Sequence, residues 1–370
     1  MNTRRITAGA VAVLAAVGVA ACGSSNNSTG TSSPGGKTSS SATVDGAGST
    51  LAAPIYEQWS TTLKSSGLTL NYNAVGSGTG QTDLASATVA FAGSDPSLTS
   101  ADLATLKAKG PILQFPVAAG AITVSYNLQG VKSGLKLTGP LIAEIFSGKI
   151  TSWNDAAIKA LNPGVSLPST HITVIHRSDS SGTTDGFTTY LSDVSPAWAK
   201  TIGSGKDVKW PVGTGAAKNA GVAAAVKQTP GAVGYVEQAY ALQNGFTYAA
   251  VKNSGGAWVL PSIANTSSAF LGVKVPANLA ISTINSPNSG AYPIVSQTFL
   301  DAYKDPCKDG GLSQSTAKGL FQFLGYALGA GQKTLGSGSN ELPYAPVPAS
   351  LAAKDNAQLK TMTCNGASVS

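Results

Sequence analysis

One segment of the sequence combines the residue types that bind oxyanions. Arg177 and Asp179 are followed by the donor-rich residues Ser181, Gly182 and Thr183. A run of apolar residues precedes Arg177, so we expect a strand to end at the arginine and a helix to begin at the donors. A guanidinium binds two oxygens of a tetrahedral anion, while amides and hydroxyls at a helix N-terminus bind the others. Asp179 could orient Arg177, but a surface arginine beside a loop aspartate is an equally good interpretation of this segment alone.

Three other turns rich in Gly, Ser and Thr have the same arrangement, each after an expected strand and before an expected helix. Singly, such turns more often serve capping and chain reversal than ligand binding. Four of them in a chain with few charges favour an anion pocket built from neutral donors. The three turns are residues 46–51, 76–80 and 93–97.

Motifs for catalysis, nucleotides and metals are absent from the sequence. It contains no G-x-x-x-x-G-K-[ST], no G-x-S-x-G and no H-E-x-x-H. The two histidines, His171 and His176, fall on opposite faces of an expected strand, which makes them poor partners for a metal. We therefore expect no catalytic residue, no metal and no cofactor.

The elements around these turns alternate between strand and helix, a pattern typical of parallel sheets with helices on their faces. The sequence predicts an α/β fold. We expect a turn at 46–48, strands at 68–75, 89–92, 113–126 and 172–175, and helices at 53–64, 100–109 and 184–191.

Length and composition indicate a folded chain of about two domains. Of the 370 residues, 42% are hydrophobic and only 11% are charged. The formal net charge is +7, but the basic residues form no run and no stripe with aromatic residues. A nucleic-acid partner is therefore disfavoured.

The N-terminal residues predict export. Residues 1–21 have a basic start, an apolar middle and small residues before Cys22, as in a signal peptide. Val19-Ala20-Ala21-Cys22 resembles the lipobox of bacterial lipoproteins, in which the cysteine is lipidated; the alternative is an ordinary signal peptide with a chance cysteine. Residues 22–43 read as a disordered tether rich in Ser, Thr and Gly, with a span of roughly 25 Å.

The two remaining cysteines, Cys307 and Cys364, are expected to form a disulfide, because an exported chain meets oxidising conditions. Free thiols or a redox pair are the weaker alternative, since the two residues do not form a Cys-x-x-Cys motif.

Together these segments resemble the PstS family, the phosphate-binding proteins of the bacterial high-affinity phosphate importer. The resemblance covers most of the chain after the tether, and the order and spacing of its motifs are specific. The matching segments are 46–50 with 53–59, 76–78, 92–95, 146–153, 177–187, 209–213 and 230–237.

The resemblance implies a two-lobed periplasmic-binding-protein fold of type II, in which two crossover hinge strands connect the lobes and a cleft closes on the anion. We place the crossings near Tyr126 and Tyr292. Lobe I then comprises residues 44–125 and 292–370, and lobe II comprises residues 126–291.

The family's phosphate contacts carry over to matching positions of this sequence. They are Thr50, the amide of Leu51, Ser77, Asp95, Arg177, Ser181, Gly182 and Thr183. Asp179 is expected to pair with Arg177 and not to contact the phosphate itself. Leu51 replaces a phenylalanine found in some members, which reshapes the wall of the cleft. Asp95 is expected to select phosphate over sulfate, because only phosphate carries a proton to donate to it.

These expectations describe a monomeric lipoprotein on the outer face of the cell membrane. It captures inorganic phosphate and passes it to a membrane permease driven by an ATPase. The alternatives are a secreted phosphatase-like enzyme, an adhesin or phosphate sensor, and a receptor for another tetrahedral oxyanion.

Overall fold

The computed structural model describes residues 42–339 and 341–369. The expected signal peptide, Cys22 and the tether up to residue 41 lie outside the described residues. Ala42 and Thr43, which we assigned to the tether, already pair with Leu68 and Thr69 of a neighbouring strand. Within the described ranges, no helix is both long and apolar enough to cross a bilayer.

The first half of a ten-stranded sheet has the strand order β2-β1-β3-β12-β4. Strands β1, β2 and β3 are parallel to one another, and β12 is antiparallel to both β3 and β4. Their bounds are β1 Ala42–Gly48, β2 Leu68–Ala74, β3 Phe91–Ser94, β4 Ile112–Tyr126 and β12 Val295–Tyr303. Helices α1 (Ala53–Lys64), α2 (Ser77–Ala85) and α3 (Ser100–Leu106) each follow one of the parallel strands.

The second half continues the sheet in the order β4-β8-β6-β7. Strands β6, β7 and β8 are parallel, and β8 is antiparallel to the end of β4. Their bounds are β6 Thr173–Arg177, β7 Thr214–Ala216 and β8 Ala232–Glu237. The helices that follow them are α6 (Gly182–Val194), α8 (Lys218–Gln228) and α9 (Gln238–Gln243).

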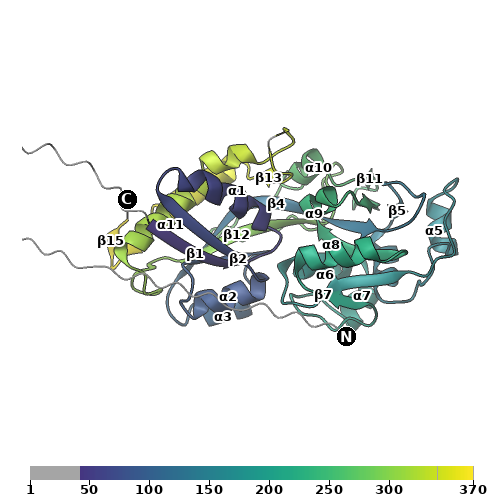
Figure 1. The fold of residues 1–370 in the computed structure, drawn as a ribbon, viewed down its shortest axis with the longest axis horizontal. Helices are drawn as coiled ribbons and strands as arrows, with labels where there is room; N and C mark the ends of the chain where they lie inside the picture. Colours follow the sequence, from purple (N-terminus) through teal and green to yellow (C-terminus); the bar gives the residue numbers. More distant parts are fainter. Residues whose placement is uncertain (1–41, 340, 370) are drawn as a thin grey trace, which may run out of the picture. The chain divides into compact units, whose positions relative to one another are not determined.

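Strand β4 belongs to both halves. It pairs with β12 as far as Ala121 and with β8 from Ile122 onward. The second connection lies just before β12, where Val295 pairs with Ala121. In Figure 1, β4 lies between β1 and β2 on one side and α6, α7 and α8 on the other.

The remaining elements surround this sheet. The helices are α4 Gly139–Phe146, α5 Ala156–Leu161, α7 Pro196–Thr201, α10 Ile263–Ser268, α11 Gln314–Ala327, α12 Ala349–Leu359 and the 3-10 helix η1 Ala330–Thr334. The short strands are β5 Lys136–Leu137, β9 Thr247–Tyr248, β10 Ala250–Lys252, β11 Trp258–Val259, β13 Ala345–Pro346, β14 Thr363–Cys364 and β15 Ala367–Ser368.

Most of the expected elements are confirmed within a few residues, and the helix at 53–64 has the expected bounds. The turn expected at 46–48 is wrong, because these residues are the end of β1. Small residues are required there for packing. A Cβ at Gly46 would lie 2.1 Å from Cζ of Phe91, so only glycine lets the ring cover this strand.

Aromatic packing in the second half of the sheet holds β6, the strand that ends at Arg177, in place. The ring of Phe187 on α6 stacks on Tyr235 of β8, with centroids 4.4 Å apart. The hydroxyl of Tyr235 accepts the backbone N–H of Arg177 at 3.0 Å and bonds the hydroxyl of Thr184 at 2.6 Å. The core therefore fixes the end of β6 and the start of α6 relative to each other.

Cys307 and Cys364 form the expected disulfide, with Cα atoms 4.9 Å apart. The bridge joins β14, near the end of the chain, to the segment that follows β12. Asp305 supports this connection, since its carboxylate accepts the backbone N–H groups of Asn365 and Gly366 at 2.9 and 2.8 Å.

Candidate functional site

The four strand-to-helix turns singled out in the sequence meet at one place between the two halves of the sheet. Each turn contributes buried polar side chains, which are Thr50, Ser77, Asp95, Ser181 and Thr183. The closest approach is at Gly182, the first residue of α6. A Cβ there would lie 1.9 Å from the carbonyl oxygen of Asp95 and 2.4 Å from Oγ of Ser77. Nearby, the amide of Gly78 donates to the carbonyl of Ser180 at 3.2 Å.

Asp95 follows β3 and is buried without a partner for its carboxylate. Neither carboxylate oxygen accepts a hydrogen bond from a described residue, and the side chain is only 1% exposed. Burial raises the pKa of Asp95 to about 6, although the hydroxyls of Ser49 and Thr298 and the charge of Arg177 oppose this rise. A buried acceptor without a donor is costly, so this carboxylate is suited to a ligand that brings a proton.

Arg177 ends β6 and is held by Asp179, which was one of the two interpretations left open by the sequence. Its Nε donates to one carboxylate oxygen of Asp179 at 2.7 Å, and its Nη2 pairs with the other. Burial alone would raise the pKa of Asp179, but the hydrogen bonds and charge of Arg177 lower it. Nη1 donates to Oγ1 of Thr183 at 3.4 Å. One N–H on each terminal nitrogen has no partner among the described residues, which leaves a fork of two donors.

The remaining expected residues supply neutral donors at helix starts. Ser77 begins α2, and its Oγ accepts the backbone N–H of Asp95 at 3.3 Å. Ser181 caps α6 by accepting the N–H of Thr184 at 3.0 Å. Leu51 is fully buried, and its carbonyl accepts a hydrogen bond from the hydroxyl of Tyr344. The polar group that it can still offer to the site is its backbone N–H.

Asn219 joins this group and was missed in the sequence. It lies at the start of α8 and is fully buried. Its side-chain Nδ2 donates to Oγ1 of Thr50 at 2.9 Å and to Oγ1 of Thr183 at 3.2 Å. The two threonines come from the two halves of the sheet, so Asn219 connects them. The only sequence signal was a polar side chain at a helix start that otherwise lacks a capping residue.

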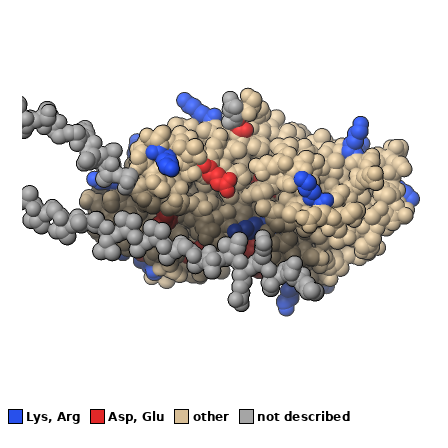
Figure 2. Space-filling model, viewed as in Figure 1, with Lys and Arg blue, Asp and Glu red and all other residues tan. Residues whose placement is uncertain are grey.

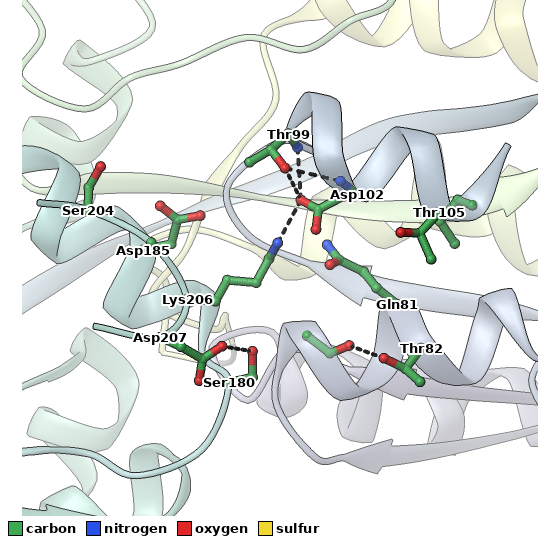
Figure 3. Close-up of a pocket in the computed structure, with 13 residues that line it drawn as sticks. Gln81, Thr82, Thr99, Asp102, Thr105, Ser180, Asp185, Ser204, Lys206 and Asp207 are labelled. Atoms are coloured by element: carbon green, nitrogen blue, oxygen red, sulfur yellow. Dashed lines mark hydrogen bonds and ion pairs between the residues drawn. The ribbon is translucent and has the colours of Figure 1, made fainter. Parts of the chain in front are cut away.

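A pocket of about 520 Å³ lies beside this cluster, between α2 and α3 on one side and the start of α6 with residues 204–207 on the other. Lys206 and Asp102 meet across it, with Nζ and Oδ2 at 2.6 Å (Figure 3). Asp102 also closes the capping box of α3 with Thr99. Burial alone would raise the pKa of Asp102, but its bonds to Lys206 and Thr99 lower it. No motif marked this ion pair in the sequence.

The cluster can bind a tetrahedral anion through neutral hydroxyls and amides, one guanidinium and one carboxylate. Charged side chains are few and well separated on the face shown in Figure 2, whereas Asp102, Asp185, Lys206 and Asp207 line the pocket beside the cluster. His176, the histidine nearest in sequence, stacks on Trp210 with centroids 4.8 Å apart. Its Nδ1 forms a hydrogen bond with the backbone carbonyl of Arg177. Stacking and this hydrogen bond give the ring a structural role.

The chain is similar to known proteins over most of its length. Residues 33–330 match the model of the PBP superfamily domain. "Phosphate-binding protein PstS" of Xylella fastidiosa is 40% identical over 335 residues, covering 89% of this chain and 88% of that protein. "Phosphate-binding protein PstS3" of Mycobacterium bovis is 36% identical over 359 residues, covering 92% of this chain and 94% of that protein.

Solved structures resemble the fold at lower identity. A high-affinity periplasmic phosphate-binding protein solved with phosphate (PfluDING) has a TM-score of 0.66 at 22% identity, covering 85% of this chain and 93% of its own. The phosphate-binding protein of Stenotrophomonas maltophilia has a TM-score of 0.64 at 21% identity. The match covers 88% of this chain and 96% of that protein's chain. The expected two-lobed periplasmic-binding-protein fold is confirmed.

Proposed function

The chain belongs to the PstS family of phosphate-binding proteins, and from this premise we propose that it captures inorganic phosphate for an ABC-type phosphate importer. The relatives named above are phosphate-binding proteins. The observation that carries the proposal is the buried carboxylate of Asp95, which accepts no well-formed hydrogen bond from a described residue, has only the hydroxyls of Ser49 and Thr298 as neighbouring donors, and faces the same cluster as the guanidinium of Arg177. A monohydrogen or dihydrogen phosphate supplies what both groups need.

We propose that the eight residues expected from the sequence form the phosphate site. Arg177 offers two N–H donors that have no partner within residues 42–339 and 341–369, and the starts of α2 and α6 offer amides and hydroxyls. Phosphate oxygens accept all of these, while the phosphate hydroxyl donates to Asp95. Sulfate has no proton to donate at neutral pH, so it would set its lone pairs against those of Asp95.

The two lobes are proposed as residues 44–125 with 292–370, and residues 126–291. The two connections at β4 and before β12 support a hinge, since bending there would separate Thr50, Ser77 and Asp95 from Arg177 and α6. The buried cluster then corresponds to the closed form, in which the anion is shielded from water.

Membrane attachment and partners are proposed on the sequence. Lipidation at Cys22 would hold the protein at the outer face of the cell membrane, and the tether would let it reach the permease and its ATPase. We propose that the protein acts there as a monomer.

The competing proposals are a phosphatase on the same fold, an adhesin or phosphate sensor, and a receptor for another oxyanion. Phosphate titrated into the phosphate-free protein in a calorimeter should bind at one site, and Arg177→Ala should weaken that binding at least about 100-fold. Release of a chromogenic alcohol from its phosphate ester should stay at the background rate. Hydrolysis that depends on the cluster would favour the enzyme, whereas equal binding by Arg177→Ala would remove this site from the proposal.

A further inference from the structure

Asn219 is held in one orientation by the backbone of β8. Its Oδ1 accepts the N–H of Glu237 at 3.0 Å. An amide N–H can meet only the oxygen of the Asn side chain, so the Nδ2 group must face the other way, toward Thr50 and Thr183. The direction of these two hydrogen bonds is therefore fixed by chemistry, with Asn219 donating and both hydroxyl oxygens accepting.

Each threonine oxygen already accepts two hydrogen bonds. Oγ1 of Thr50 accepts from Nδ2 and from the backbone N–H of Asn219, at 2.9 and 3.3 Å. Oγ1 of Thr183 accepts from Nδ2 of Asn219 and from Nη1 of Arg177, at 3.2 and 3.4 Å. A hydroxyl has two lone pairs and one hydrogen, so both lone pairs are used and only the hydrogen remains.

Neither hydroxyl donates to another described residue. Thr50 and Thr183 are both buried in the cluster that contains Asp95 and Arg177. Their hydrogens must therefore be donated to a ligand that presents acceptors, as an oxyanion does.

From this arrangement we propose that Asn219 is a positioning residue for anion binding, which sets the hydroxyls of Thr50 and Thr183 as obligate donors from the two lobes. This inference rests on the proposed phosphate site and deepens it. Asn219 does not need to touch the anion. It determines which way two ligand-contacting hydroxyls point before the anion arrives, so no free energy is spent on turning them.

The decisive variant is Asn219→Asp, which keeps the size of the side chain and an oxygen for the N–H of Glu237. It replaces the Nδ2 donor by a carboxylate oxygen, so that the two threonine hydroxyls turn to donate to the new carboxylate instead of the anion. We expect phosphate affinity at pH 8.5 to fall at least about 100-fold relative to the wild type. At pH 5.5 the loss should be much smaller, because a protonated carboxyl at position 219 donates again.

This pH profile separates positioning from packing. A purely structural defect would give the same affinity ratio at both pH values. The wild type, measured alongside, corrects for the charged and titratable groups around the cluster, which are Asp95, Arg177, Asp179 and Glu237. Asn253→Asp is the matched control, because Asn253 is also buried, accepts one backbone N–H and donates to two backbone carbonyls. It should leave phosphate affinity unchanged.

A second variant covers the case in which Asn219→Asp does not fold. Asn219→Ala and Thr50→Val are combined in a double-mutant cycle of phosphate affinity. If the double variant loses less phosphate affinity than the sum of the two single variants, Asn219 acts through Thr50. If the losses in binding free energy are fully additive, this role is overturned. If the wild type itself fails to bind phosphate, the proposed function falls with the inference. If the wild type binds and Asn219→Asp shows a pH-independent loss or no loss, only the positioning role falls.

Discussion

Lys206 and Asp102, separated by 104 residues in the sequence, form an ion pair with Nζ and Oδ2 at 2.6 Å across the pocket beside the anion cluster. The pair joins residues 204–207, which pack on the start of α6, to the first turn of α3. Both side chains are mostly buried, at 12% and 17% exposed. The attraction is therefore less screened than at an open surface, and it holds the two proposed lobes together.

Lys206→Met should weaken the closed form while leaving the cluster itself unchanged. We expect phosphate release to become about 3- to 10-fold faster, which corresponds to about 1 kcal/mol for a partly buried ion pair. Stopped-flow fluorescence of release checks this prediction at low and high salt. Lys149→Met is a suitable control, because Lys149 pairs with Glu144 at an exposed position. If Lys206→Met releases phosphate at the wild-type rate, the ion pair does not stabilise the closed form.

Gly182→Ala should block closure. The added Cβ would lie 1.9 Å from the carbonyl oxygen of Asp95 and 2.3 Å from its Oδ2, so the two halves cannot approach as they do here. We expect phosphate affinity to fall at least about 100-fold, with the protein still folded in circular dichroism. Gly325→Ala is the control, since nothing lies within 4 Å of its Cβ position in α11. Normal binding by Gly182→Ala would be incompatible with this contact in the bound form.

The stability of the phosphate-free protein should fall as the pH rises through the pKa of Asp95. Burial raises this pKa from 3.8 to about 6, so the folded state holds the proton more tightly than the unfolded state. The favourable contribution is complete below pH 3.8 and is lost as the pH passes about 6. Relative to Asp95→Asn, the wild type should lose on the order of 2 kcal/mol of unfolding free energy between about pH 4 and 7.

Urea unfolding of both proteins at several pH values, without phosphate, measures this difference. Other buried carboxyls with raised pKa values, such as Glu237 and Asp301 at about 8, are present in both proteins. The charge of Asp95 makes the smallest of the contributions that raise their pKa values, so most of their effect on stability cancels. Parallel pH dependences for the two proteins would show that Asp95 titrates normally.

Removing the disulfide should affect stability and leave binding intact. Cys307 and Cys364 are 57 residues apart, and closing a loop of this size contributes about 4 kcal/mol in the chain-entropy model. The variant Cys307→Ser with Cys364→Ser should lose up to this amount in urea unfolding. Phosphate affinity at about 20 °C should stay within about twofold, because the proposed site uses neither cysteine. A large loss of affinity in a folded variant would link the C-terminal segment to the site.

Local sequence patterns predicted the strand-to-helix turns because their cause is local. Arg177 ends a run rich in β-branched residues, and Ser181 caps the helix that follows. The positions of both residues therefore follow from their neighbours in the sequence. The pattern at Gly46 and Gly48 predicted a turn, but glycine is required there by contacts with β3, namely the ring of Phe91 at Gly46 and the backbone of Gly93 at Gly48. That requirement depends on tertiary packing.

Asn219 and Lys206 could not be predicted for the same reason. The partners of Asn219 are 169 and 36 residues away. Its orientation depends on the backbone N–H of Glu237, which β8 presents beside α8. Lys206 lies in a loop whose neighbour across the pocket is set by how the two halves meet. Neither residue type is unusual at its position in the sequence.

The role of Asp95 can be tested most directly by titrating sulfate and phosphate calorimetrically into the wild type and Asp95→Asn at about pH 7. We expect the wild type to bind phosphate and to give no heat of binding with sulfate, while Asp95→Asn binds phosphate more weakly and binds sulfate measurably. An Asp95→Asn protein that binds phosphate as the wild type does and still rejects sulfate would show that Asp95 does not select between the two anions.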